Sequence, residues 1–399
     1  MDGLRQLFVR RGDEVPAITG LRAISLLWVL VQHVQQGLRP LAATPEGAAF
    51  LMHPALHLGW AGNLGVDIFF VISGYLIGGM LMREREVSGT LSFRSFYTRR
   101  AMRLLPAYAL AIVVYLAWGT PNPGYAWANV LFVNNFVPFT KQFMAHAWSL
   151  AIEEQFYALF PFFVLLLYRA QPRWRTPLVA LTVAVFAAIA VAVVFGQDLE
   201  LSFVRPNIDQ FWRYMDLFYV KPHTRFGALF IGVLVVRLEA GGSVLRLLER
   251  RPLLAGLLAG VAVLTMSYVV LVFPECRAPD GARLVFGSVS LALDGYAFAL
   301  AVGYLVLLSR TRSRVGRLLS GALGARVLRP IAQVSYTAYL LHPLCVEAVS
   351  QRLGFDLGHA GASYARLVAV AVLATLVASR PVYLLVERPV MVRRPPRPV

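Results

Sequence analysis

The chain has 399 residues, is 58% hydrophobic, and carries a formal net charge of +17 with a mean hydropathy of +0.63. Soluble domains are only about 45–50% apolar on a comparable count, so this composition excludes an ordinary soluble domain. Apolar residues recur in blocks of about 20, the length that crosses a bilayer core. The two cysteines, Cys276 and Cys345, exclude a disulfide framework, and no CxxC or metal-ligand spacing is present.

The apolar blocks predict an all-α polytopic membrane protein with ten transmembrane helices and both termini in the cytoplasm. The expected spans are 16–37, 64–82, 104–120, 148–168, 177–195, 222–238, 252–273, 284–308, 328–350 and 363–386. With this topology, most of the 38 Lys and Arg residues fall on the inner side, as the positive-inside rule requires. The same distribution argues against nucleic-acid binding. The loops are too short to fold alone, so residues 1–399 are predicted to form one integral membrane domain, with 390–399 a disordered basic tail.

The first expected span contains two ionisable residues, Arg22 and His33, separated by eleven positions. Such side chains are costly inside a membrane and are usually functional. Eleven positions correspond to almost three helical turns, so both residues share one face and lie roughly 16 Å apart along the axis. Two interpretations stay open. Arg22 snorkels to the inner interface while His33 bonds a neighbouring helix, or His33 acts as a general base.

The second expected span begins with the sequence GVDIFFVISGY, which places Asp67 near its outer end. This carboxylate either caps the helix or pairs with His33 and fixes the tautomer of its imidazole. Gly65 and Gly74 are expected to allow close packing of helices.

The inner end of the third expected span holds Arg99, Arg100 and Arg103. Arg100 and Arg103 are three positions apart and therefore share a helix face. Arginine forks match phosphate oxygens with two hydrogen bonds. The cluster is read either as a phosphate site or as a plain positive-inside anchor.

The fourth expected span opens with HAWSLAIEEQFY. His146, Ser149 and Glu153 follow the i, i+3, i+7 pattern of one helix stripe. Together with the adjacent carboxylate and glutamine, they indicate a polar cavity that faces outward. Trp148 belongs either to this cavity or to the interfacial aromatic belt.

Three shorter polar motifs lie further along the chain. His223 and Arg225 open the sixth span in PHTRFG, Tyr339 and His342 lie within the ninth in SYTAYLLHP, and the sequence ERP ends the tenth. Each motif alone is read as a polar contact between helices or as part of a functional site.

Taken together, these motifs resemble the acyltransferase-3 family of integral membrane acyltransferases. The match runs in order from Arg22-x10-His33 through GVDIFFVISGYLI, FYTRRAMRLLP, HAWSLAIEEQFY, HTRFGALFIG and SYTAYLLHP to ERP. The resemblance implies a multi-pass enzyme of the bacterial inner membrane, and the lack of metal-ligand spacing predicts that it needs no metal. Such an enzyme transfers an acyl group, commonly acetyl, from cytoplasmic acyl-CoA to a hydroxyl of a cell-envelope glycan or glycolipid.

The resemblance also assigns roles to residues. The essential histidine and arginine of the family match His33 and Arg22. Asp67 is expected to orient His33 on the residue-level interpretation above, independently of the resemblance. The family's RxxR pair, linked to CoA recognition, matches Arg100 and Arg103, and Arg99 lies beside it. The residues expected to shape the acceptor cavity are His146, Trp148, Ser149, Glu153, His223, Arg225, Tyr339 and His342.

Some family members carry an SGNH-type domain at the C-terminus, and this chain is expected to resemble the stand-alone members. A transporter of a small anionic or sugar substrate is the alternative function. Internal repeats would favour that alternative, but the GVDIFF and WSLAIEEQFY motifs have no counterpart in the other half of the chain.

Overall fold

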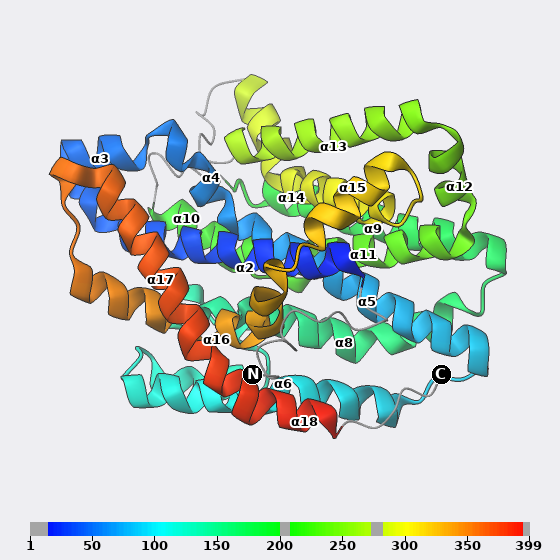
Figure 1. Cartoon of the computed structure of the whole chain (residues 1–399), viewed down its shortest axis with the longest axis horizontal. Helices are drawn as coiled ribbons and strands as arrows, with labels where there is room; N and C mark the ends of the chain where they lie inside the picture. The colour runs from blue at the N-terminus through cyan, green and yellow to red at the C-terminus, as the bar shows by residue number, and fades with distance from the viewer. Residues whose placement is uncertain (1–14, 200–207, 273–281, 394–399) are drawn as a thin grey trace. The chain divides into compact units, whose positions relative to one another are not determined.

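The computed structural model describes residues 15–199, 208–272 and 282–393 (Figure 1). Within these ranges every regular element is a helix or a helical turn, and none is a strand, which confirms the all-α prediction. The chain divides into two compact units. Unit 1 consists of Met1–Val66, Arg94–Thr120 and Leu323–Arg397, and unit 2 of Asp67–Phe93, Pro121–Ala322 and Pro398–Val399.

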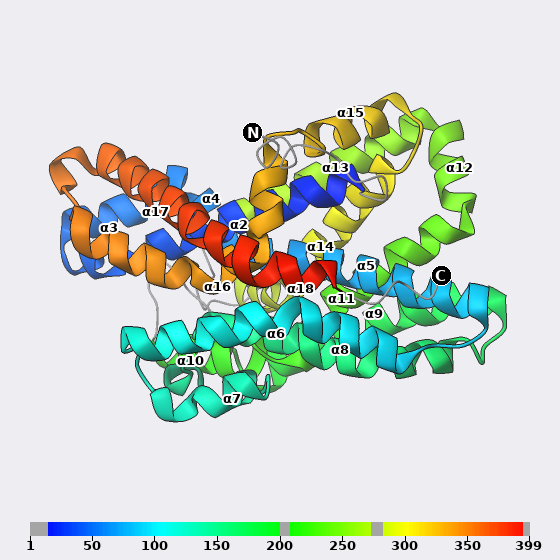
Figure 2. The same ribbon diagram turned by 60° about the horizontal axis from the view of Figure 1, so that its bottom comes forward.

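The described part of unit 1 is built around four long helices, α2 (Pro16–Gly37), α6 (Phe93–Trp118), α16 (Leu328–Leu353) and α17 (Ala360–Val382), with short helices between and after them. The short α-helices are α3 (Pro45–Leu51), α4 (His57–Trp60) and α18 (Arg388–Val392), with a π-helical segment over Tyr383–Glu387. Figure 2 shows α16 and α17 side by side along much of their length.

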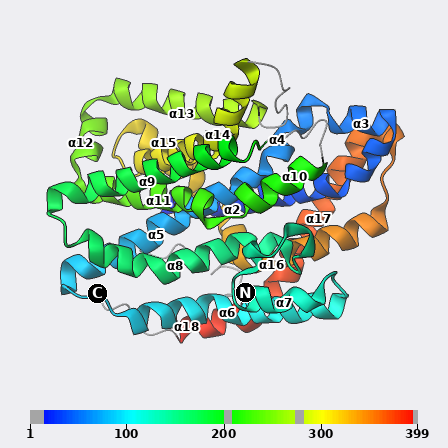
Figure 3. The same ribbon diagram turned by 180° about the vertical axis from the view of Figure 1, so that it is seen from behind.

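Unit 2 holds the remaining helices. They are α5 (Leu64–Ser88), whose first turn belongs to unit 1, α7 (Ala126–Val130), α8 (Trp148–Leu167), α9 (Pro172–Gly196), α10 (Ile208–Tyr214), α11 (Pro222–Gly241), α12 (Ser243–Arg250), α13 (Pro252–Val272), α14 (Ala282–Ser309) and α15 (Arg314–Leu323). In Figure 3, α9 and α11 lie side by side.

All ten predicted spans coincide with long helices, but fewer than ten pass as membrane spans. Among the described residues, eight helical segments are long and apolar enough to cross a membrane, or nine if α11 and α12, bent by 76° at Gly242, count as one span. The remaining helix is α16, which buries polar side chains such as Ser335, Thr337 and His342. These side chains lower the mean hydropathy of α16, although the helix is long enough to cross a membrane.

The predicted C-terminal tail falls only partly within the described residues. Its first residues are helical, because α18 runs over Arg388–Val392. The rest of the predicted tail, 394–399, lies outside the described residues, as does Cys276.

Side-chain contacts show the relative direction of α2 and α16 in unit 1. The Nη2 atom of Arg22 donates to Oγ of Ser335 over 2.9 Å, and the ring of His33 lies 4.4 Å from the ring of His342. Because both residue numbers increase together along the contact, α2 and α16 run parallel. They are the first and ninth predicted spans, and alternating topology gives these two spans the same direction.

The direction of helix α6 follows from the order of its contacts with α16 in the same way. The hydroxyl of Tyr336 donates to the carbonyl oxygen of Leu104 over 2.9 Å, and the hydroxyl of Tyr115 donates to the carbonyl oxygen of Leu340 over 3.1 Å. The order of these contacts makes α6, the third predicted span, parallel to α16.

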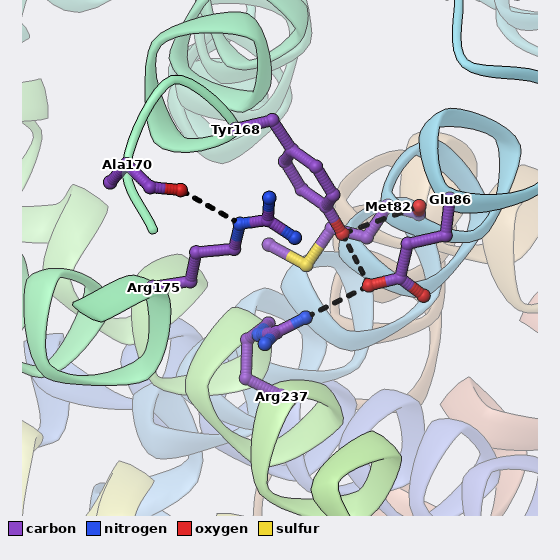
Figure 4. A network of polar contacts seen from close by, with 6 residues as sticks. All are labelled: Met82, Glu86, Tyr168, Ala170, Arg175 and Arg237. Carbon is purple, nitrogen blue, oxygen red and sulfur yellow. Dashed lines mark hydrogen bonds and ion pairs between the residues drawn. The ribbon is translucent and has the colours of Figure 1, made fainter. Parts of the chain in front are cut away.

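One end of unit 2 is joined by a polar network (Figure 4). The hydroxyl of Tyr168 donates to Oε1 of Glu86 over 2.6 Å, and Nη1 of Arg237 reaches the same oxygen at 3.1 Å. The guanidinium of Arg175 stacks 4.0 Å from the centroid of the Tyr168 ring. The C-terminal ends of α5, α8 and α11 therefore meet the start of α9, as expected for spans that alternate in direction.

Close backbone packing joins α5 to α11, as the sequence predicts for Gly74. A Cβ atom at Gly74 would overlap the carbonyl oxygen of Leu229, and one at Gly232 would overlap that of Val71. Each helix thus supplies a glycine where the other brings its backbone, which is how small residues allow membrane helices to approach.

The substitution Gly74→Ala is expected to destabilise the protein by about 1–3 kcal/mol, because one methyl group must push α5 away from α11. Gly256→Ala on α13 is the matched control, since nothing lies within 4 Å of an added Cβ there. Thermal unfolding in detergent measures both variants. Equal melting temperatures for the two would contradict the packing assignment.

Candidate active site

The imidazole of His33 is held in one tautomer. Its Nδ1 atom lies 2.9 Å from the carbonyl oxygen of Val29, one turn earlier on α2. A carbonyl oxygen only accepts hydrogen bonds, so Nδ1 carries the proton and Nε2 of the neutral ring keeps its lone pair. This is the state from which an imidazole can act as a general base at neutral pH.

The ring against His33 belongs to His342 on α16. The two ring centroids are 4.4 Å apart and the ring planes are nearly perpendicular, at 87°. His342 is fully buried, and its Nδ1 lies 2.7 Å from the carbonyl oxygen of Tyr339. The sequence places His342 in the acceptor set and gives no sign of this contact, because no local periodicity links residues so far apart in the chain.

Arg22 and His33 face the same neighbouring helix, as their spacing predicts. The guanidinium of Arg22, which is half-buried, donates to Ser335 on α16. Ser335 and His342 are seven positions apart on α16 and therefore share a face. Ser335 opens the SYTAYLLHP motif but is not among the predicted site residues, although a small hydroxyl in an apolar span is a recurrent partner in helix contacts.

The arginine cluster lies in the early turns of α6. Arg99 is buried and its Nη1 donates to Oγ of Ser95. Arg100 and Arg103 are half-buried and, at i and i+3, lie on one side of the helix. Arg22, His33 and all three of these arginines thus belong to unit 1.

In unit 2, three of the predicted site residues come together. Asp67 and Arg225 form an ion pair of 2.9 Å with side chains only 2% and 8% exposed. The guanidinium carbon of Arg225 lies 5.5 Å from the ring centroid of Trp148 and 5.2 Å from that of Tyr219. The structure thus gives Asp67 a guanidinium as its partner, and its role as the orienting carboxylate of His33 stays a prediction.

Glu153 is held at both carboxylate oxygens. Ser73 on α5 donates to Oε1 over 2.5 Å, and Tyr157 donates to Oε2 over 3.3 Å. On the same stretch of chain, Ser149 is buried and His146 is half-buried, whereas His223 at the start of α11 is exposed. The predicted acceptor residues of unit 2 therefore differ in solvent exposure, from buried to exposed.

Comparison with known proteins identifies the family. A family model described as an acyltransferase domain (Acyl_transf_3) matches residues 15–383. The chain belongs to this acyltransferase-3 family. It is 34% identical over 172 residues to peptidoglycan O-acetyltransferase OatA of Listeria monocytogenes, an overlap of 38% of this chain and 24% of that protein.

A second relative gives a similar match. O-acetyltransferase OatA of Staphylococcus aureus is 34% identical over 178 residues, which cover 40% of this chain and 26% of the relative. The chain thus spans about a quarter of the length of the curated relatives it matches. No solved structure matches it. The resemblance found in the sequence motifs is confirmed at the level of the acyltransferase-3 family.

Proposed function

We propose that this acyltransferase-3 protein transfers an acyl group, acetyl in the first instance, from cytoplasmic acyl-CoA to a hydroxyl of a cell-envelope glycan or glycolipid. The observation that carries this proposal is the 2.9 Å contact between Nδ1 of His33 and the carbonyl oxygen of Val29, which leaves Nε2 of the neutral ring with its lone pair. The printed names of the relatives, O-acetyltransferases including one that acts on peptidoglycan, support the choice of acetyl and of a glycan acceptor.

The proposed reaction needs one base and no metal. Nε2 of His33 takes the proton of the acceptor hydroxyl as its oxygen attacks the carbonyl carbon of the thioester. The tetrahedral adduct collapses, the carbon–sulfur bond breaks, and the leaving thiolate takes the proton from the imidazolium to give free CoA. An acyl-His33 intermediate is the alternative route.

The donor is proposed to bind through arginines of unit 1. Arg100 and Arg103, with Arg99 beside them, hold the CoA phosphates, and Arg22 lies near the pantetheine arm. The distance of roughly 16 Å between Arg22 and His33 along α2 is comparable with the length of that arm. The nucleotide can then stay in the cytoplasm while the thioester reaches His33.

Replacing Arg103 with Ala is expected to raise the KM for acetyl-CoA about 10- to 100-fold with a much smaller change in kcat. The reason is that a hydrogen bond to a charged group contributes about 1.5–3 kcal/mol. Arg352→Ala, which removes one exposed cation at the end of α16, is the control for net charge. Steady-state kinetics with purified enzyme measure both, and an unchanged KM for Arg103→Ala would end the phosphate assignment.

The acceptor is proposed to use groups of unit 2. Aromatic faces such as those of Trp148 and Tyr219 suit the apolar face of a sugar ring, and Arg225, Asp67 and Glu153 offer donors and acceptors for hydroxyls. Three of these groups already lie close together around the guanidinium of Arg225.

The proposal is tested by turnover of radiolabelled acetyl-CoA in lipid nanodiscs with pooled envelope glycans as acceptor. Release of free CoA together with labelled glycan establishes acyl transfer. The competing function, transport, predicts instead that reconstituted vesicles take up labelled sugar or anion without consuming acetyl-CoA.

A further inference from the structure

A single hydrogen bond does not fix a histidine ring. The torsion χ2 of histidine has broad minima, so the bond from Nδ1 of His33 to Val29 restrains the rotation of the ring only within the range that this hydrogen bond tolerates. A general base must hold its lone pair within hydrogen-bond reach of the proton it takes. The proposed base therefore needs a second restraint.

His342 is placed to supply that restraint. Its ring stands nearly perpendicular to the ring of His33 at a centroid distance of 4.4 Å, an edge-to-face arrangement that aromatic rings favour. The helices that carry the two rings are also tied by the hydrogen bond from Arg22 to Ser335. The distance between the two rings is thus fixed both by their own contact and by the hydrogen bond that joins the two helices.

His342 is itself fixed by the residue that follows it. Pro343 lies inside α16 and has no N–H, so it cannot donate to the carbonyl oxygen of Tyr339, four residues earlier. That carbonyl instead accepts the Nδ1–H of His342 at 2.7 Å. The proline removes the helical N–H donor to this carbonyl, and the side chain of His342 donates to it.

We propose that His342, held by the Tyr339 carbonyl that Pro343 leaves open, is a positioning residue that fixes the ring of His33 and directs its Nε2 at the acceptor hydroxyl. The inference rests on the proposed function, in which His33 is the base. In this proposal His342 acts through the ring of His33, in place of the acceptor-cavity role expected from the sequence.

Three substitutions of His342 separate the ring from its hydrogen bond. His342→Ala removes both, His342→Asn keeps a donor for Tyr339 but no ring, and His342→Phe keeps a ring but no donor. A small displacement of a catalytic group can cost about 10²-fold, so kcat is expected to fall about 10²-fold for Ala and Asn and about tenfold for Phe. The KM for acetyl-CoA is expected to stay within about twofold of wild type, since no phosphate contact changes.

Pro343→Ala gives an independent readout. The new N–H competes for the Tyr339 carbonyl and releases His342, so kcat is expected to fall about tenfold. The melting temperature should stay equal or rise, because proline is unfavourable inside a helix. A residue that serves only the fold would not separate rate from stability in this way.

The decisive experiment repeats His342→Ala in the background of His33→Asn, with radiolabelled acetyl-CoA to follow low rates. If His342 acts through His33, its loss lowers the wild-type rate about 10²-fold and leaves the His33→Asn rate unchanged. An equal loss in both backgrounds, or no loss in wild type, would overturn the inference while the proposed function stands. Full activity of His33→Asn would instead show that another group is the base, and failure of the wild type to consume acetyl-CoA would overturn the proposed function itself.

Discussion

Replacing His33 with Asn is expected to lower kcat by about 10²–10⁴-fold, the usual contribution of a general base. The amide nitrogen of Asn can still donate to the carbonyl oxygen of Val29, as Nδ1 does in the wild type, so the local structure of α2 is kept. What the variant lacks is the lone pair of Nε2. Turnover of acetyl-CoA measures the loss, and calorimetric titration checks that acetyl-CoA still binds with about the wild-type Kd.

The control for this variant is His359→Asn in the loop between α16 and α17. His359 belongs to the same unit and its side chain is 81% exposed, so its loss should leave kcat within about twofold of wild type. If His33→Asn bound no acetyl-CoA, the residue would belong to donor binding. If it retained full turnover, another group would have to be the base.

The sequence predicts the helices well because each span is a local property. Ten apolar blocks indicate ten long helices, and the structure has a helix at each of them. Among the described residues, α16 is the predicted span that fails the composition test even when α11 and α12 count as one span, because it carries buried polar side chains. Its polar residues, from Ser335 to His342, contact α2 and α6 and cannot be replaced by apolar ones without losing those contacts.

The partners of the site residues could not be predicted in the same way, because they lie on other helices. Spacing along one helix places Arg22 and His33 on the same face, and the structure agrees. This spacing does not show which of the other nine predicted spans packs against that face of the first span. The sequence therefore offers Asp67 as the partner of His33, while in the structure Asp67 pairs with Arg225 and the ring against His33 is that of His342.

The sequence also does not show how His342 and Pro343 are related in the structure. The His-Pro pair of α16 reads as a polar residue followed by a helix breaker. Only the distance from His342 to the Tyr339 carbonyl shows that the proline opens the acceptor used by the histidine. A proline inside an apolar span, directly after a residue with a side-chain donor, is a signal that could be sought in other sequences.

Replacing Asp67 with Asn is expected to destabilise the protein by about 3–5 kcal/mol, because it leaves the charge of Arg225 buried without its counterion. The Asp67 side chain is 2% exposed and that of Arg225 is 8% exposed, so water cannot replace the lost carboxylate. The double substitution Asp67→Asn with Arg225→Gln should recover a large part of the loss, since both charges are then absent. Unfolding in detergent titrations measures all three variants.

The matched control is Glu86→Gln, which breaks the ion pair with Arg237. Glu86 is 44% exposed, and ion pairs open to solvent contribute at most about 1 kcal/mol, so this variant should unfold close to wild type. Unchanged stability of Asp67→Asn would contradict this structural account. If acyl transfer were lost at that unchanged stability, the KM for the acceptor would separate a role of Asp67 in acceptor binding from the catalytic role predicted from the GVDIFF motif.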